Sequence, residues 1–318
     1  MEKFISCDWG TSSFRIRLID ASSLAILAER STEKGIASVY KLWDRHGEGE
    51  RSRPLFYQAI LAEEIEMMER EAGLLLKGTD LILSGMASSS LGMLEMPYKR
   101  LPFSTDGSDL LVKTFPATTL FPYELTLISG ASTEDDVMRG EETQLVGCEG
   151  DLSEEQLFIF PGTHSKHILV KENKAIGLRT YMTGEFFELL SKKSILADSV
   201  DPGAPDANKG LLGSGSLQRF GDGVIDGAYG NLLHSAFMVR THRLLGTMTK
   251  EENYFYLSGL LIGTELGELA GSRKPLTIVS NEVLKNYYET AFRKLGLTGI
   301  RFQDAAVAAI RGQRKIVS

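Results

Sequence analysis

Cysteine is scarce in this 318-residue chain, and the two that occur, Cys7 and Cys148, lie in different segments with no CxxC pair. This pattern argues against a disulfide framework and favours reduced thiols. No apolar run approaches the roughly 20 residues that span a bilayer, and no basic and then apolar leader opens the sequence. We therefore expect a cytoplasmic protein that has no membrane partner.

Positive charge is also in short supply, since 35 lysines and arginines stand against 42 acidic residues and the net charge is −7. No basic stripe is present, which argues against nucleic acid as a partner. The five histidines show no zinc spacing. The 42% hydrophobic content is sufficient for full cores, and the length suits two domains of ordinary size.

The most informative stretch is Phe4–Asp20, which reads as strand, tight polar turn and alternating strand. Gly10 allows close approach of a ligand, and the hydroxyls and N–H groups of Thr11 and Ser12 can hold phosphate oxygens. Asp8 alone would repel phosphate, but it fits beside Mg²⁺, which takes carboxylate and phosphate oxygens together. The alternative, from these residues alone, is an ordinary hairpin with a capping aspartate.

The stretch recurs roughly half a chain later, at Leu157–Val170. Gly162 and Thr163 align with Gly10 and Thr11, and an apolar run precedes both turns. The repeat suggests two related lobes. Because the second copy lacks the acid, one turn would face metal and phosphate and the other phosphate alone. This combination would fit a nucleoside triphosphate with one Mg²⁺.

Each half of the chain reads as a meander of strands followed by helices. The polar segment 151–156 sets the boundary between an N-terminal lobe, 1–153, and a C-terminal lobe, 154–318. We expect an α/β fold in which each lobe is a mixed sheet flanked by helices. Segment 97–122 has four of the nine prolines and is expected to be irregular. Helices are predicted at 53–72, 185–196, 231–245, 251–270, 282–295 and 304–313, and loops at 85–92 and 201–215.

Five motifs together resemble the 2-dehydro-3-deoxygalactonokinase family of the sugar kinase, actin and heat-shock ATPase superfamily: DWGT at 8–11, MRGEETQL at 138–145, PGTHSK at 161–166, MTGE at 182–185 and LSGLLIG at 257–263. The resemblance covers nearly the whole chain. It implies two ribonuclease H-like (actin-like ATPase) lobes with an interlobe cleft. It also implies ATP- and Mg²⁺-dependent phosphorylation of a small sugar acid, 2-dehydro-3-deoxy-D-galactonate, at its 6-hydroxyl.

The acids of the second motif are the candidates for the catalytic base. In the related glycerol kinases a Gly-Asp-Gln-Gln run stands here and its Asp is the base, so the resemblance places Glu141 in that role after Gly140. Glu142 is the reserve, and Asp8 is the implied metal ligand. The alternative reading is a solvated acidic helix start near the N-terminal dipole.

Substrate and nucleotide candidates follow from the same motifs. Arg139 could clamp the substrate carboxylate, or form a structural salt bridge with Asp135 or Glu142. Segment 257–263 is expected to pack between helices more than to line a pocket. The remaining candidates are Gly85, Met86, Ser88, Arg15, His164 and Glu185 for substrate, Lys166 for phosphate, and Ser280 with Asn281 for adenine.

Two alternative functions stay open. One is a kinase of another sugar acid or polyol, because acceptor pockets are shaped by loops. The other is a nucleotide-switched, actin-like binding protein. Either epimer of the sugar acid fits the sequence as acceptor, and so does a homodimeric state of the protein.

Overall fold

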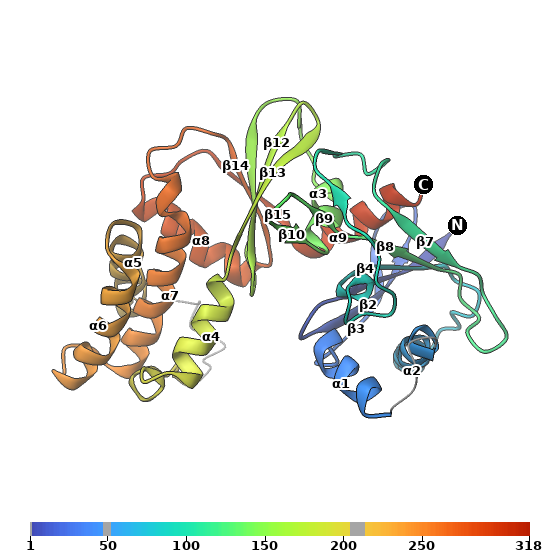
Figure 1. Ribbon diagram of the computed structural model, residues 1–318, viewed down its shortest axis with the longest axis horizontal. Coiled ribbons are helices and arrows are strands. Elements are labelled where there is room, and N and C mark those ends of the chain that lie inside the picture. The colour runs from blue at the N-terminus through green and yellow to red at the C-terminus, as the bar shows by residue number, and fades with distance from the viewer. Residues whose placement is uncertain (1, 47–51, 204–213) are drawn as a thin grey trace. The chain divides into compact units, whose positions relative to one another are not determined.

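A computed structural model describes residues 2–46, 52–203 and 214–318. The chain divides into two compact units (Figure 1). Unit 1 comprises Met1–Glu155, Ile168–Leu178 and Ala305–Ser318, and unit 2 comprises Gln156–His167 and Arg179–Asp304. Both units combine strands with helices, as an α/β protein should. Most of the loop predicted at 201–215 falls outside the described residues.

The main sheet of unit 1 has the order β3-β2-β1-β4-β8-β7. The predicted meander pairs antiparallel, whereas β4 pairs parallel to β1, and Asp8 lies beside Ser84 and Trp9 beside Gly85. The ends of β1 and β4 therefore meet at one edge of the sheet. The strand bounds are β1 Lys3–Trp9, β2 Phe14–Asp20, β3 Ile26–Thr32, β4 Leu81–Gly85, β7 Val112–Phe115 and β8 Leu125–Ile128.

Helices cover both faces of this sheet because alternate strand residues point to opposite sides. Ile5, Cys7 and Trp9 share a buried core with residues of α1 (Ile36–His46) and α2 (Arg53–Ala72). Phe4 packs instead in a second cluster with Ile310 of α9 (Ala305–Ile316). The predicted bounds of α2 are confirmed, and Gly73 ends it in the left-handed conformation.

Helix α3 (Glu141–Gly147) packs closely along α9. A Cβ atom added to Gly147 or to Gly312 would lie only 1.8 Å from a backbone oxygen of the facing helix. Segment 97–122, predicted to be irregular, supplies β7 as well as the short strands β5 (Lys99–Arg100) and β6 (Phe103–Ser104). Small strands β9 (Ala131–Ser132) and β10 (Val137–Met138) join β5 in a separate three-stranded sheet.

A third sheet has the order β15-β14-β11-β12-β13-β6. Within unit 2, β11 (Gln156–Phe160), β14 (Leu276–Ser280) and β15 (Ile300–Asp304) run parallel. The residues of β12 (Ser165–Lys171) and β13 (Lys174–Tyr181) are divided between the two units. The helices of unit 2 are α4 Thr183–Lys193, α5 Ser214–Tyr229, α6 Leu232–Leu244, α7 Lys250–Leu266 and α8 Glu282–Lys294.

Helices α5 and α7 approach so closely that their backbones touch. Cβ atoms added to Gly223 and Gly227 on α5, or to Gly259 and Gly263 on α7, would lie 2.0–2.2 Å from backbone oxygens of the other helix. The packing role predicted for the glycines of segment 257–263 is therefore confirmed.

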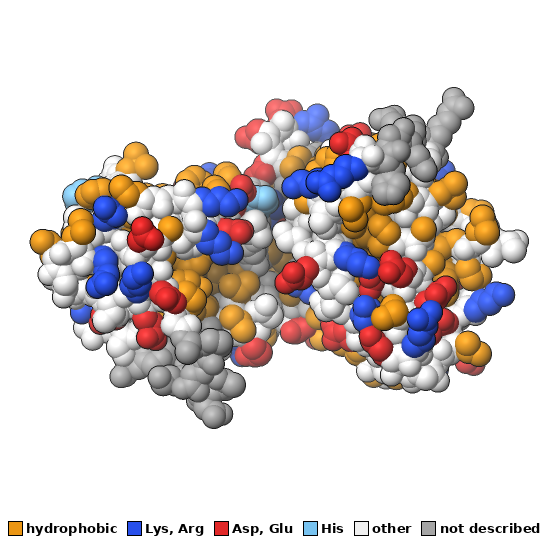
Figure 2. Space-filling view, turned by 90° about the horizontal axis from the view of Figure 1, so that it is seen from below, with side chains coloured by type: hydrophobic (Ala, Val, Ile, Leu, Met, Phe, Trp, Pro, Cys, Tyr) orange, Lys and Arg blue, Asp and Glu red, His pale blue; other side chains and the backbone are white. Residues whose placement is uncertain are grey.

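Basic and acidic side chains are interspersed among hydrophobic ones over the face shown in Figure 2. No helix within the described ranges is both long and apolar enough to cross a bilayer.

Candidate active site

The first Gly-Thr turn joins β1 to β2 at the edge of the unit 1 sheet. The N–H of Gly10 donates to the carbonyl of Ser13 at 2.8 Å, which closes the turn. Asp8 precedes it with a side chain 22% exposed, and Arg15 Nη1 lies 3.5 Å from its Oδ2. Burial raises the pKa of Asp8, while Arg15 and Arg17 act in the opposite direction. The turn therefore presents a partly open carboxylate beside backbone and hydroxyl donors.

Two glycines bring the loop after β4 against Asp8 and the acidic motif against that loop. Gly85 has φ +88°, and a Cβ there would lie 2.8 Å from the Trp9 carbonyl oxygen and 3.2 Å from Asp8 Oδ1. Gly140 has φ +110°, and its Cβ position lies 3.5 Å from Gly85 Cα. Only glycine adopts such backbone angles without strain at so close an approach. The first turn, the loop after β4 and the acidic motif thus meet within unit 1.

The two acids of that motif have different surroundings at the start of α3. Glu142 is buried, and its carboxyl group accepts hydrogen bonds from Gly140 N at 2.8 and 3.0 Å and from Thr143 Oγ1 at 2.9 Å. Burial, with the neighbouring charge of Glu141, raises the pKa of Glu142 to about 8. Glu141 is less buried, and its Oε2 accepts from Arg139 N at 3.1 Å.

Arg139 binds the loop after β4 through its guanidinium group. Nη1 donates to Ser88 Oγ at 2.7 Å, Nη2 to the Met96 carbonyl at 3.1 Å and Nε to Tyr98 Oη at 3.1 Å. The guanidinium carbon also lies 4.0 Å from the centre of the Tyr98 ring. These contacts bring Arg139 to Ser88, two residues predicted separately, and they hold the short 3-10 turn Met86–Ser88 in place.

Gln313 of α9 forms hydrogen bonds to the same edge of the sheet. Its Nε2 donates to the Cys7 carbonyl and to Ser84 Oγ, both at 2.9 Å, and the residue is fully buried. These acceptors immediately precede Asp8 and Gly85. A lone glutamine near the end of the chain carries no sequence signal for this role, and the sequence analysis missed it.

The second Gly-Thr turn joins β11 to β12 in unit 2 and contacts the start of α4. The N–H of Glu185 donates to the Thr163 carbonyl at 3.0 Å, and a Cβ on Gly184 would lie 2.6 Å from the Gly162 carbonyl oxygen. His164 Nε2 lies 2.5 Å from Glu185 Oε2. The structure thus brings together Gly162, Thr163, His164 and Glu185. Lys166, also predicted, is buried and donates to Thr180 Oγ1 at 2.9 Å.

A buried carboxylate, Glu265 of α7, joins the elements around this turn. Its Oε1 accepts from Ser165 Oγ at 2.7 Å and lies 3.0 Å from His167 Nε2, while its Oε2 accepts from Thr183 Oγ1 at 2.5 Å and from Tyr288 Oη at 2.7 Å. The side chain is 1% exposed. One residue therefore connects β12, α4 and α8.

An apolar pocket opens next to the second turn, entirely within unit 2. Four aromatic side chains contribute to its wall, and sequence analysis missed all of them. Ser258, Leu261 and Ile262 also line it, so segment 257–263 supplies a pocket wall as well as packing glycines. The lining residues are Gly162, Thr183, Gly184, Phe187, Tyr254, Ser258, Leu261, Ile262, Leu284, Tyr287 and Tyr288.

The predicted adenine residues lie at the start of α8, beside this pocket wall. Asn281 caps the helix by accepting from Leu284 N at 2.9 Å, and Ser280 is buried at the end of β14. Among the described residues, no three His, Cys, Asp or Glu side chains are grouped so that they could hold a metal ion.

Comparison with known proteins gives a consistent assignment. The chain is 29% identical to 2-dehydro-3-deoxygalactonokinase of Escherichia coli (strain K12), covering 97% of this chain and 96% of that protein. It is 30% identical to DgoK1 of Rhizobium meliloti (strain 1021), a protein assigned the same activity, covering 97% and 94%.

Comparison with solved structures supports the same family and fold. A Sinorhizobium meliloti protein assigned as a 2-dehydro-3-deoxygalactonokinase superposes with a TM-score of 0.81 at 27% identity, over 99% of this chain and 95% of that one. The Clostridium difficile activator of 2-hydroxyisocaproyl-CoA dehydratase, solved with bound ADPNP, shares the fold with a TM-score of 0.52 at 12% identity, over 98% and 93%. The predicted fold class is confirmed. The model of the 2-keto-3-deoxy-galactonokinase family matches residues 8–316, and the chain belongs to that family.

Proposed function

We propose that this protein transfers the γ-phosphoryl group of ATP to the 6-hydroxyl of 2-dehydro-3-deoxy-D-galactonate. One observation carries the nucleotide part of the proposal: the aromatic pocket of unit 2 is continuous with the second Gly-Thr turn, since Gly162 belongs to both. The flat ring of adenine can pack against the aromatic wall, and the phosphates can accept hydrogen bonds from the adjoining backbone and hydroxyl groups. Family membership supports the acceptor.

In this proposal adenine occupies the pocket between Tyr254 and Tyr287, while Asn281 fixes the start of α8 beside it. Thr163 and Gly162 contact phosphate oxygens in unit 2, and Thr11 with Ser12 does so in unit 1. Lys166, on β12, adds positive charge near the second turn, and this charge favours phosphate binding there. Glu185 and His164 lie side by side at that turn.

We propose Asp8 as the protein ligand of a Mg²⁺ ion that accompanies ATP. Mg²⁺ in nucleotide sites is commonly held by one or two carboxylates together with phosphate oxygens and water. A single, partly exposed carboxylate at the edge of the first turn fits this pattern, and no larger cluster is required. The ion would supply neutralisation of the phosphate charge.

Glu141 is the proposed general base that orients the acceptor hydroxyl and takes its proton. Glu142 is less suited, because its carboxyl group is buried, already bonded to Gly140 and Thr143, and neutral near pH 7. The acceptor itself would lie against the Gly85–Ser88 loop. Arg139 holds that loop through Ser88, and Arg15 lies beside Asp8.

The test is ADP release with Mg·ATP across 2-dehydro-3-deoxygalactonate, its gluconate epimer, gluconate, glycerol and glucose. We expect strong turnover with the first. Asp8→Asn should lower kcat by roughly 100-fold or more while sparing the fold, and Glu141→Gln should lower kcat with ATP affinity kept. Folded protein that binds ATP but turns over none of the panel would refute the proposed activity. Preferred turnover of another acceptor would replace the substrate and leave the kinase.

A further inference from the structure

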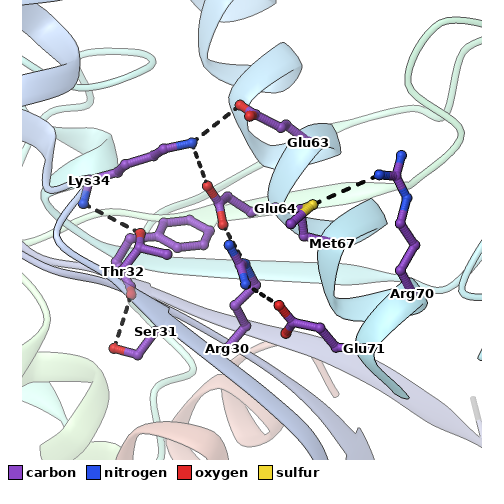
Figure 3. Close-up of polar contacts among 10 residues, drawn as sticks. Arg30, Ser31, Thr32, Lys34, Glu63, Glu64, Met67, Arg70 and Glu71 are labelled. Atoms are coloured by element: carbon purple, nitrogen blue, oxygen red, sulfur yellow. Dashed lines mark hydrogen bonds and ion pairs between the residues drawn. The ribbon is translucent and has the colours of Figure 1, made fainter. Parts of the chain in front are cut away.

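A cluster of charged side chains joins β3 and the residues just after it to α2 in unit 1 (Figure 3). At its centre Glu64 is 1% exposed, which is rare for a carboxylate unless it is paired. Arg30 Nε lies 2.7 Å from Glu64 Oε2, and Lys34 Nζ lies 2.7 Å from Glu64 Oε1. These two cations outweigh burial and lower the pKa of Glu64.

Lys34 begins the segment that touches the first Gly-Thr turn. Its carbonyl accepts a hydrogen bond from Trp9 Nε1 at 2.8 Å. Directly after it, Ile36 N donates to the Gly10 carbonyl at 3.0 Å and Ala37 N to the Thr11 carbonyl at 3.1 Å. The backbones are in contact, because a Cβ on Gly35 would lie 2.3 Å from the Thr11 oxygen.

These two bonds fix the direction of the donors in the turn. In a planar trans peptide, the N–H points opposite to the carbonyl of the preceding residue. Holding the Gly10 carbonyl toward α1 therefore turns the Thr11 N–H away from α1. Holding the Thr11 carbonyl toward α1 turns the Ser12 N–H away from α1 in the same manner. The start of α1 thus aims two consecutive N–H groups at the opposite side of the turn.

We propose that Glu64 and Lys34 act together as positioning residues for the first turn, with the Glu64–Lys34 ion pair fixing the 34–37 segment that orients the Thr11 and Ser12 N–H groups toward phosphate. This assignment rests on the proposed phosphate role of that turn. Neither residue touches substrate; they act through the segment from Lys34 to Ala37. Glu64 is anchored by Arg30 as well, so it stays paired when Lys34 is changed.

Hydrogen exchange tests the positional link without any need for activity. Lys34→Met removes the charge and leaves Glu64 paired with Arg30. We expect the Ile36 and Ala37 amides to exchange about tenfold faster, as expected when a charge-assisted contact that holds them is lost. Glu63→Gln is the matched control, because Glu63 is the exposed partner of Lys34, at 3.3 Å. It should leave exchange unchanged, and Lys34→Arg should restore it.

Kinetics then tests the consequence for phosphoryl transfer. Measured per folded molecule and well below Tm, Lys34→Met should lower kcat by about tenfold, since small misplacements of catalytic groups carry large rate penalties. The KM of the acceptor should stay within twofold of the wild-type value. A merely structural role would lower Tm and leave kcat per folded molecule unchanged.

Glu64→Gln provides a second variant that keeps the side-chain shape. Unchanged exchange at Ile36 and Ala37 in both folded variants would overturn the proposal, and so would faster exchange with an unaltered kcat. If the wild-type protein phosphorylates no acceptor, the proposed function fails separately, and the exchange data alone decide whether the cluster holds the turn.

Discussion

Removing the carboxylate of Glu265 should be among the most destabilising single changes in unit 2. Four donors from three elements converge on its two oxygens: Ser165, His167, Thr183 and Tyr288. Glu265→Ala would leave all four without this acceptor and would open a cavity among buried groups. The structure allows a sharp comparison, because Glu265→Gln keeps the shape and one acceptor oxygen.

The expected magnitude follows from counting donors. A buried donor left unpaired costs about 1–3 kcal/mol, but hydroxyls can rotate toward other partners. If roughly half of the four remain unpaired, Glu265→Ala should lower the free energy of unfolding by about 2–6 kcal/mol. In Glu265→Gln the hydroxyls of Thr183 and Tyr288 can turn to accept from the amide. That variant should therefore lose only about 1–2 kcal/mol, the charge-assisted part of the bonds.

Urea unfolding followed by circular dichroism measures both values, and calorimetry measures nucleotide affinity at a temperature where each variant is folded. Affinity should fall in the order wild type, Gln, Ala, because Thr183 and Tyr288 also line the pocket. An Ala variant within about 1 kcal/mol of wild type would refute the reasoning, since that is the net contribution of a single ordinary hydrogen bond. It would mean that the four donors find other acceptors.

Three further predictions concern other parts of the chain. The pKa of Glu142 is raised to about 8, so the folded state favours its protonated form. Its contribution to stability is complete below the unfolded pKa near 4.5 and is lost progressively as pH rises through 8. Urea titrations should show about 3 kcal/mol less stability at pH 8.5 than at pH 5.5, and Glu142→Gln should remove that difference. Ser258→Leu should fill the aromatic pocket and weaken ATP binding at least tenfold in calorimetry, with Tm kept within a few degrees. Gly259→Ala should cost about 1–3 kcal/mol of unfolding free energy because its Cβ would lie 2.0 Å from the Phe220 carbonyl oxygen; Gly215→Ala, where nothing lies within 4 Å, should be neutral or slightly stabilising in the same assay.

Local signals in the sequence were sufficient for much of the fold. Helix α2 is found at its predicted bounds, because an apolar pattern begins after Arg53 and a left-handed glycine, Gly73, ends it. Helix α5 was missed because its glycines, including Gly223 and Gly227, lower helix propensity and suggest a loop. Their purpose is visible only against α7, whose backbone they contact.

The candidate site residues also fall into two groups: those that local sequence motifs identify and those that only tertiary packing brings together. The Gly-Thr turns and the acidic motif are contiguous in sequence and could be identified there. Glu265 could not, because its partners Ser165 and Tyr288 stand 100 and 23 residues away. The pocket tyrosines resemble ordinary core aromatics until α7 and α8 are packed together. Contacts made across such distances in the chain depend on tertiary packing, which no local pattern encodes.

The two turns share a feature that extends the sequence repeat. Each is contacted by the start of the helix that follows its meander: Ala37 N donates to the Thr11 carbonyl at 3.1 Å, and Glu185 N to the Thr163 carbonyl at 3.0 Å. In both cases a glycine makes the approach possible, Gly35 against the first turn and Gly184 against the second. The repeated unit is therefore a Gly-Thr turn together with a glycine-bearing helix start that holds the threonine carbonyl. A hydrogen bond to that carbonyl points the N–H of the following residue away from the helix. The same backbone arrangement therefore orients an N–H donor in each unit.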